Sequence, residues 1–374
     1  MPLARATARF TPGYGCRLQA PSDVSLPDVP LPEGPPPDET AADDGFAPPT
    51  PVAPTDAGIA AALDRVFAER PGAAPKQVKA VVVVKNGRVV AERYAAGFSV
   101  RTRLRSYSVA KSFTNALVGV LVREGRLAVD QPLGAREWPA GDPRAAIRIE
   151  DSMRMTSGLD AAETGSGFDP VSRMLYLEPD MAGFAASRPP KAPPGTVFEY
   201  SSADTLLVDR RIVEVIGGGP AGVRAFAESE LFRPLGMRGV TMEFDGRGVF
   251  VGSERVYATA RDFARFGRLY LDDGIAPDGR RLLPEGWVAW SRRSTLGEPC
   301  GAGFWTLDGP SAFAARWVGQ GFPKDGFFAS GNLGQRIYIV SSRMLIVARF
   351  GFSSPPDFGI ADDITLIAAA VKAK

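Results

Sequence analysis

Two β-rich segments near opposite ends of the chain constrain its fold most strongly. Residues 78–97 hold two runs of β-branched residues around Asn86-Gly87, a dipeptide that favours a tight hairpin turn. Residues 334–351 hold two more such runs around a polar turn. Helical spacing precedes the first pair at 58–70 and follows the second at 362–374. This order predicts an α/β (α+β) fold with one antiparallel sheet from both chain ends, flanked by helices.

The segments outside this sheet differ in composition. Residues 130–255 are rich in Gly and Pro with short helical patterns, which predicts an inserted, mainly helical lobe. Residues 20–57 are rich in Pro, Asp, Glu and Ala, with too little apolar surface to fold alone. We therefore expect an N-terminal extension over 1–57 that is largely extended or disordered, and a domain over 58–374.

Composition excludes several classes of function. A net charge of +2 gives no reason to expect a nucleic-acid partner, and no apolar run has membrane-spanning length. The chain has no histidine, which excludes a Ser-His-Asp triad and the usual zinc sites. Its two cysteines, Cys16 and Cys300, form one disulfide or stay as two thiols. The first ten residues lack a signal peptide's apolar segment, so we expect a cytoplasmic protein or an exported one that has been trimmed.

A serine and a lysine stand three residues apart at the start of a predicted helix. Ser108 and Lys111 precede an apolar stripe that includes Phe113 and Leu117, and Gly125 ends the helix. Residues three apart share one helix face, and the helix dipole favours an anion at its first turn. A buried lysine there has a lowered pKa and can take a proton, which would activate a serine without histidine. The alternative is an N-cap serine beside a solvated lysine; the apolar flanks favour burial.

The same stretch carries a family resemblance, and it continues along the chain in order. Residues 107–134 resemble the active-site block of class C beta-lactamase-like serine hydrolases, within the beta-lactamase and penicillin-binding-protein superfamily. That group includes esterases, D-amino-acid peptidases and 6-aminohexanoate-dimer hydrolases. Further blocks of this resemblance, which spans roughly 58–374, lie at 149–160, 173–189, 193–208, 257–274 with 282–288, and 301–309 with 327–340.

The resemblance implies roles for matching residues. Ser108 would be the acylated nucleophile and Lys111 its base partner, and Tyr200 would share the proton transfer. Which of Lys111 and Tyr200 acts as the base stays open. Ser202 would face the same cleft, and the backbone N–H groups of Ser108 and Asn332 would form the oxyanion hole.

The third family motif departs from the beta-lactamase pattern. Where those enzymes have Lys-Thr-Gly, this chain has Ala329, Ser330 and Gly331. Gly331 keeps the close backbone approach, and we expect Ser330 and Gly331 to line the substrate site. Ala329 removes the cation near the substrate carboxylate, so weak or no beta-lactamase activity is expected. Lys324 is expected to be only a loop lysine.

One aromatic residue and two aspartates are also candidates for a role at the site. Tyr176, which the resemblance places over the cleft, either contacts substrate or packs. Asp204 and Asp209 follow Tyr200 on a predicted helix and are expected to be solvated.

Together these observations predict a serine hydrolase that cleaves an ester or amide through an acyl-Ser108 intermediate. No metal or organic cofactor is implied, and the expected partner is a small ester, amide or peptide-like substrate. The alternative is a catalytically silent penicillin-binding-protein-like module that binds peptidoglycan fragments or a protein. The oligomeric state and the compartment are not determined by the sequence.

Overall fold

The computed structural model describes residues 8–11, 13–18, 46 and 50–373, and the chain forms two compact units. Unit 1 comprises Met1–Glu33, Ala110–Leu231 and Thr241–Val256. Unit 2 comprises Gly34–Val109, Phe232–Val240 and Tyr257–Lys374. Most of the segment 20–57, which composition predicts to be extended or disordered, lies outside the described residues.

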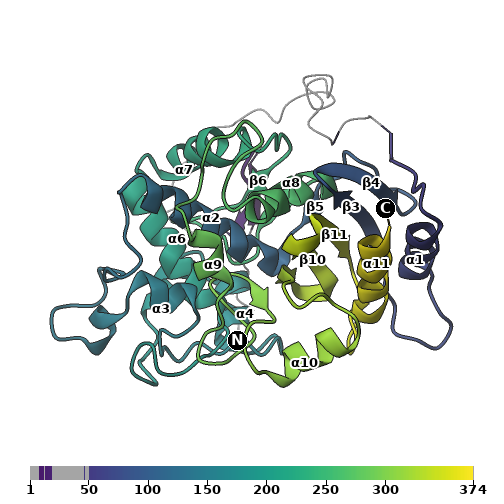
Figure 1. The fold of residues 1–374 in the computed structure, drawn as a ribbon. Helices are drawn as coiled ribbons and strands as arrows, with labels where there is room; N and C mark the ends of the chain where they lie inside the picture. Colours follow the sequence, from purple (N-terminus) through teal and green to yellow (C-terminus); the bar gives the residue numbers. More distant parts are fainter. Residues whose placement is uncertain (1–7, 12, 19–45, 47–49, 374) are drawn as a thin grey trace. The chain divides into compact units, whose positions relative to one another are not determined.

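Unit 2 is built on a six-stranded sheet whose neighbouring strands are all antiparallel. Its strand order is β4-β3-β11-β10-β9-β8, and Val83 of β3 pairs with Val347 of β11, which joins the two chain ends (Figure 1). The predicted sheet is therefore confirmed. The strands are β3 (Val78–Lys85), β4 (Arg88–Tyr94), β8 (Trp305–Thr306), β9 (Phe327–Gly331), β10 (Gln335–Val340) and β11 (Leu345–Gly351).

Helices cover both faces of this sheet, because its central strands are apolar on both sides. Alternate residues such as Val83 and Val347 join one core with α1 (Ala57–Phe67) and α11 (Ile360–Lys372). On the opposite face lies α8 (Ala260–Leu271), packed so closely that a Cβ on Gly267 would lie 3.0 Å from Ile346. Unit 2 also contains the 3-10 turn η1 (Tyr107–Val109) and the helices α9 (Trp287–Arg292) and α10 (Ala312–Gly319).

Phe46 and Val52 of the extension contact other residues of unit 2. Phe46 is 1% exposed, and the Arg265 guanidinium lies 4.7 Å from its ring centroid. Val52 exchanges backbone and side-chain hydrogen bonds with Glu92. The short strand β5 (Leu104–Arg105), which comes just before η1 in the sequence, pairs with β7 (Val256–Ala258).

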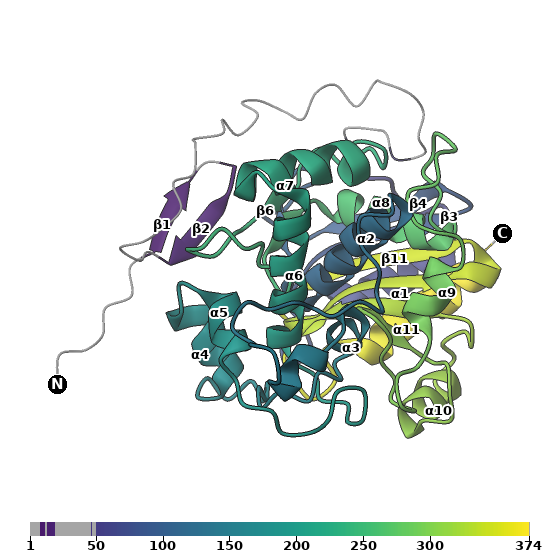
Figure 2. The ribbon, with the colours of Figure 1, turned by 90° about the vertical axis from the view of Figure 1, so that its left-hand side faces the viewer.

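Unit 1 is organised around the helix α6 (Ser202–Ile216) (Figure 2). The hydroxyl of Ser201 caps the N-terminus of this helix. Five other helices pack against it: α2 (Ala110–Arg123), α3 (Ile149–Met153), α4 (Pro170–Leu177), α5 (Met181–Ala186) and α7 (Gly219–Ala227). The short strand β6 (Thr241–Met242) also belongs to this unit.

An N-terminal hairpin, β1 (Ala8–Thr11) and β2 (Gly15–Leu18), packs on unit 1. The Cys16 N–H donates to Glu243 at 2.8 Å, and buried Tyr14 packs edge-on against Phe244. Cys16 and Cys300 are both thiols and are not joined in a disulfide. No helix in the described part of the chain has the length and apolar character to span a bilayer.

Candidate active site

The candidate nucleophile lies in unit 2 beside the end of strand β9. Ser108 is the middle residue of η1, and Gly331 is the last residue of β9. A Cβ on Gly331 would lie 2.4 Å from the Ser106 carbonyl oxygen and 3.0 Å from the Ser108 nitrogen. Only glycine permits this approach, so the backbone beside Ser108 depends on Gly331.

The segment after Gly331 contains the second backbone N–H that the family resemblance implies. Asn332 begins the short turn η4 (Asn332–Gly334), and its side-chain oxygen accepts a hydrogen bond from the Leu333 N–H at 2.9 Å. Leu333 has a φ of 58°, in the left-handed region. Ser330 precedes this turn on β9, whereas Ala329 is buried within the strand. Lys324 is an exposed loop residue.

The candidate proton-transfer residues meet in unit 1. Lys111 on α2 is 5% exposed, and its Nζ donates to Ser202 Oγ at 2.9 Å and to the Ser253 carbonyl at 3.0 Å. The same Nζ lies 4.9 Å from the centroid of the Tyr200 ring. Tyr200 and Ser202, which follow Lys111 by about 90 residues in the sequence, thus lie beside its buried ammonium.

The charge environment of Lys111 differs from the one that the sequence predicts. Burial lowers its pKa, but attraction to Tyr200, Glu163 and Glu254 outweighs burial, so the pKa is raised above its usual value. The expectation of a lowered pKa for Lys111 is therefore wrong. Burial was inferred correctly, whereas the acidic neighbours were not foreseen.

Glu163 and Glu254 carry no motif that could have identified them. Glu163 lies in the loop before α4 and accepts the Ser202 N–H at 2.6 Å, at the first turn of α6. Glu254 is buried and pairs with Arg255 at 3.0 Å. Both approach Lys111 only because loops from separate parts of unit 1 fold together.

Tyr176 belongs to the same neighbourhood. Its hydroxyl donates to Glu254 at 3.5 Å, while 51% of the residue stays exposed. An aromatic ring that is half exposed beside a buried acid can contact a bound molecule without moving. The substrate contact that the resemblance implies for Tyr176 stays a prediction.

Two aspartates on α6 correct a prediction. Asp204 and Asp209, expected to be solvated, are 2% and 0% exposed. Burial raises the pKa of Asp204 to about 7 and raises that of Asp209 well above its usual range. The helix was correctly predicted, but its polar residues face the interior of unit 1.

Comparison with known proteins identifies the family. The family model described as Beta-lactamase matches residues 59–372. The chain is 27% identical to the 6-aminohexanoate-dimer hydrolase of Paenarthrobacter ureafaciens over 74% of this chain and 73% of that protein.

Solved structures agree at the level of the fold. A penicillin-binding protein homolog from Caulobacter crescentus aligns with a TM-score of 0.63 and 20% identity, covering 85% of this chain and 98% of that one. A class C beta-lactamase from Rhodobacter sphaeroides aligns with a TM-score of 0.60 and 16% identity, covering 83% and 98%. Because the family model spans most of its length, the chain belongs to the beta-lactamase family and is a serine hydrolase of that superfamily.

Proposed function

We propose that this protein hydrolyses esters or amides of small acyl groups through an acyl-Ser108 intermediate. The observation that carries the proposal is the buried Lys111, bonded to Ser202 and faced by Tyr200. Lys111 follows Ser108 by three residues, and η1 continues directly into α2. Chain connectivity therefore keeps the serine one helical turn from this proton-transfer group.

In the proposed acylation, Ser108 Oγ attacks the carbonyl carbon and loses its proton. The raised pKa of Lys111 supports a resting enzyme in which the lysine keeps its own proton. In that enzyme Tyr200 is a tyrosinate, and the Lys111 ammonium stabilises the negative charge on its oxygen. The tyrosinate accepts the proton of Ser108 and becomes a neutral phenol. The N–H groups of Ser108 and Asn332 bind the oxyanion that forms on the carbonyl oxygen.

Collapse of this intermediate breaks the ester or amide bond. The departing alcohol or amine takes the proton from Tyr200, and the acyl group stays on Ser108. Water next attacks the acyl carbon as Tyr200 removes its proton. That proton returns to Ser108 when the free acid leaves, so the enzyme is regenerated.

The proposed substrates follow from the residues around these groups. Ala329 offers no cation where beta-lactamases have lysine, which supports acyl groups other than penicillins. Tyr176, Ser202, Ser330 and Gly331 are proposed to contact the acyl part. The name of the Paenarthrobacter relative supports including linear amides among the candidate substrates.

A covalent probe tests the proposal. A fluorophosphonate should label the wild-type protein stoichiometrically and Ser108→Ala not at all, and Ser108→Ala should lose several orders of magnitude in p-nitrophenyl ester hydrolysis. Ser187→Ala removes an exposed hydroxyl of unit 1 and should behave as wild type. Absence of labelling and of turnover across esters, D-amino-acid amides and aminohexanoate oligomers would instead support a silent binding module.

A further inference from the structure

One buried side chain holds the turn that contains Asn332. Gln335, the first residue of β10, is 2% exposed. Its Nε2 donates to the carbonyl oxygens of Asn332 at 3.0 Å, Leu333 at 3.2 Å and Gly351 at 2.7 Å. Its Oε1 accepts the Gly351 N–H at 3.0 Å. Three carbonyls surround one end of the Gln335 carboxamide, and an N–H faces the other end. Only the orientation with Nε2 toward the carbonyls therefore gives every one of these groups a hydrogen-bond partner.

The turn needs such support because of its backbone conformation. Leu333 and Gly334 follow one another with φ values of 58° and 83°. A leucine in the left-handed region costs free energy, so the turn persists only if its surroundings hold it. The Asn332 N–H belongs to the peptide unit between Gly331 and Asn332, and Gly331 lies opposite Gln335 in the β9–β10 pairing. The carbonyls that follow Asn332 are further groups through which the turn can be held.

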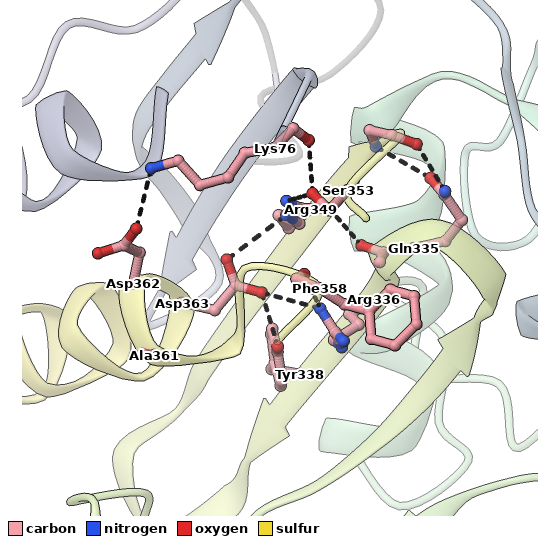
Figure 3. Close-up of polar contacts among 12 residues, drawn as sticks. Lys76, Gln335, Arg336, Tyr338, Arg349, Ser353, Phe358, Ala361, Asp362 and Asp363 are labelled. Carbon is pink, nitrogen blue, oxygen red and sulfur yellow. Dashed lines mark hydrogen bonds and ion pairs between the residues drawn. The ribbon is translucent and has the colours of Figure 1, made fainter. Parts of the chain in front are cut away.

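A second layer of buried groups holds the rest of the turn (Figure 3). Arg349 donates to the Gly334 carbonyl at 2.7 Å and to the Ser353 hydroxyl, and it is paired with Asp363. The Ser353 N–H donates to the Leu333 carbonyl at 2.9 Å. The carbonyls of Asn332, Leu333 and Gly334 thus all accept hydrogen bonds, and the donors are Gln335, Ser353 and Arg349. Of these carbonyls, those of Asn332 and Leu333 accept hydrogen bonds from Gln335.

We infer that Gln335 is the positioning residue of the oxyanion hole. By binding the Asn332 and Leu333 carbonyls, its carboxamide fixes the two peptide units after Asn332. This limits backbone rotation at Asn332 and so the direction of the Asn332 N–H, which belongs to the preceding peptide unit. It does not touch the substrate. This inference rests on the proposed function, because it assigns a task to a group that matters only if Asn332 binds an oxyanion.

A purely stabilising role makes different predictions. Loss of a buried hydrogen bond that only stabilises the fold lowers the melting temperature and leaves kcat and KM unchanged. Loss of orientation weakens binding of the charged transition state more than binding of the neutral substrate. A positioning role therefore lowers kcat and weakens tetrahedral boronate adducts, with little effect on KM.

The test compares two matched buried positions on β10. Gln335→Met keeps an unbranched side chain of similar size but removes every donor. Tyr338→Phe removes one buried hydrogen bond, to Asp363 at 2.8 Å, and leaves the hydrogen bonds from Gln335 to the turn in place. Each variant is measured as the full chain for melting temperature, kcat and KM on a p-nitrophenyl ester, fluorophosphonate labelling rate and affinity for an aryl boronic acid.

We expect Gln335→Met to lose about tenfold to a hundredfold in kcat, in labelling rate and in boronate affinity. This loss should not exceed the one that removal of a whole oxyanion-hole donor causes. KM should stay within about twofold, and Tyr338→Phe should retain wild-type kinetics. Gln335→Glu gives a second readout if the methionine variant does not fold. Its protonated carboxyl can still donate one hydrogen bond, so its kcat should recover toward wild type as the pH is lowered.

Kinetics of Gln335→Met within twofold of wild type, or equal kinetic losses in both β10 variants, would overturn the inference. Ser108→Ala is measured alongside as the test of the proposed function itself. An active Ser108→Ala variant would refute the acyl-serine mechanism. An inactive one, together with a fully active Gln335→Met, would refute the positioning role alone.

Discussion

Thr114 donates its hydroxyl hydrogen to the carboxyl group of Asp209 at 2.6 Å, inside unit 1 and with both residues buried. Asp209 also accepts the Gly252 N–H at 2.9 Å, which ties α2 and α6 to the loop that carries Ser253. The Ser253 carbonyl is in turn a partner of Lys111. The buried carboxyl of Asp209 therefore helps to hold the loop whose Ser253 carbonyl accepts a hydrogen bond from Lys111.

Thr114→Val should destabilise the protein by about 1–3 kcal/mol, because it keeps the shape of the side chain and leaves a buried carboxyl without one donor. Urea unfolding followed by fluorescence measures this. The control is Thr365→Val, whose exposed hydroxyl bonds a carbonyl of its own helix and which should change stability by less than about 0.5 kcal/mol. Equal effects at the two threonines would show that the Asp209 contact contributes nothing special.

Glu163→Gln should shift the pH dependence of kcat/KM. Attraction to Glu163 helps to raise the pKa of Lys111, so its removal lets Lys111 lose its proton at a lower pH. If the ammonium form is the active one, as proposed, the alkaline limb of the profile moves to lower pH. The control Glu214→Gln, at an exposed pair with Arg211, should leave the profile in place. A shift of the acidic limb instead would assign the base to a neutral Lys111.

Gly331→Ala should lose at least about a hundredfold in kcat/KM. The added Cβ would lie 2.4 Å from the Ser106 carbonyl, so the backbone around Ser108 must shift and the oxyanion donors are misplaced. Ester hydrolysis under steady-state conditions measures the loss. Gly319→Ala, where a Cβ meets nothing within 4 Å in α10, should keep full activity and gain up to about 1 kcal/mol of stability.

Beta-lactam turnover should be slow. Ala329 is 1% exposed and offers no cation, so nitrocefin hydrolysis is expected to fall well below hydrolysis of short p-nitrophenyl esters. Parallel assays on one preparation compare the two substrates. A kcat/KM for nitrocefin above about 10⁵ M⁻¹s⁻¹ would contradict this expectation.

Phe46→Ala should cost about 3–5 kcal/mol, since it empties the space of a ring that is 1% exposed under Arg265. Thermal unfolding measures the change, and Phe168→Ala, at a ring that is 97% exposed, is the control. A deletion of 20–57 removes Phe46 and also the Val52 partner of Glu92, so it should lower the melting temperature as well. An unchanged melting temperature in both variants would show that this part of the chain is dispensable, as composition alone suggests.

The sequence by itself determined the sheet and the location of the candidate residues. The β-branched runs around Asn86-Gly87 specify a hairpin through local turn chemistry, and the family blocks identify Ser108, Lys111 and Tyr200 by short-range spacing. The need for glycine at position 331 was also foreseeable, because it belongs to a motif. These features depend on neighbours a few residues apart in the chain.

Only the tertiary structure decided the charges and supports around those residues. The pKa of Lys111 is raised because Glu163 and Glu254 reach it from separate loops, and Asp204 and Asp209 are buried because other helices cover α6. Gln335 donates hydrogen bonds to a turn whose other hydrogen bonds come from β11 and from the segment after it. Electrostatic and hydrogen-bond partners of this kind are set by distance in space, and no local pattern in the sequence encodes that distance.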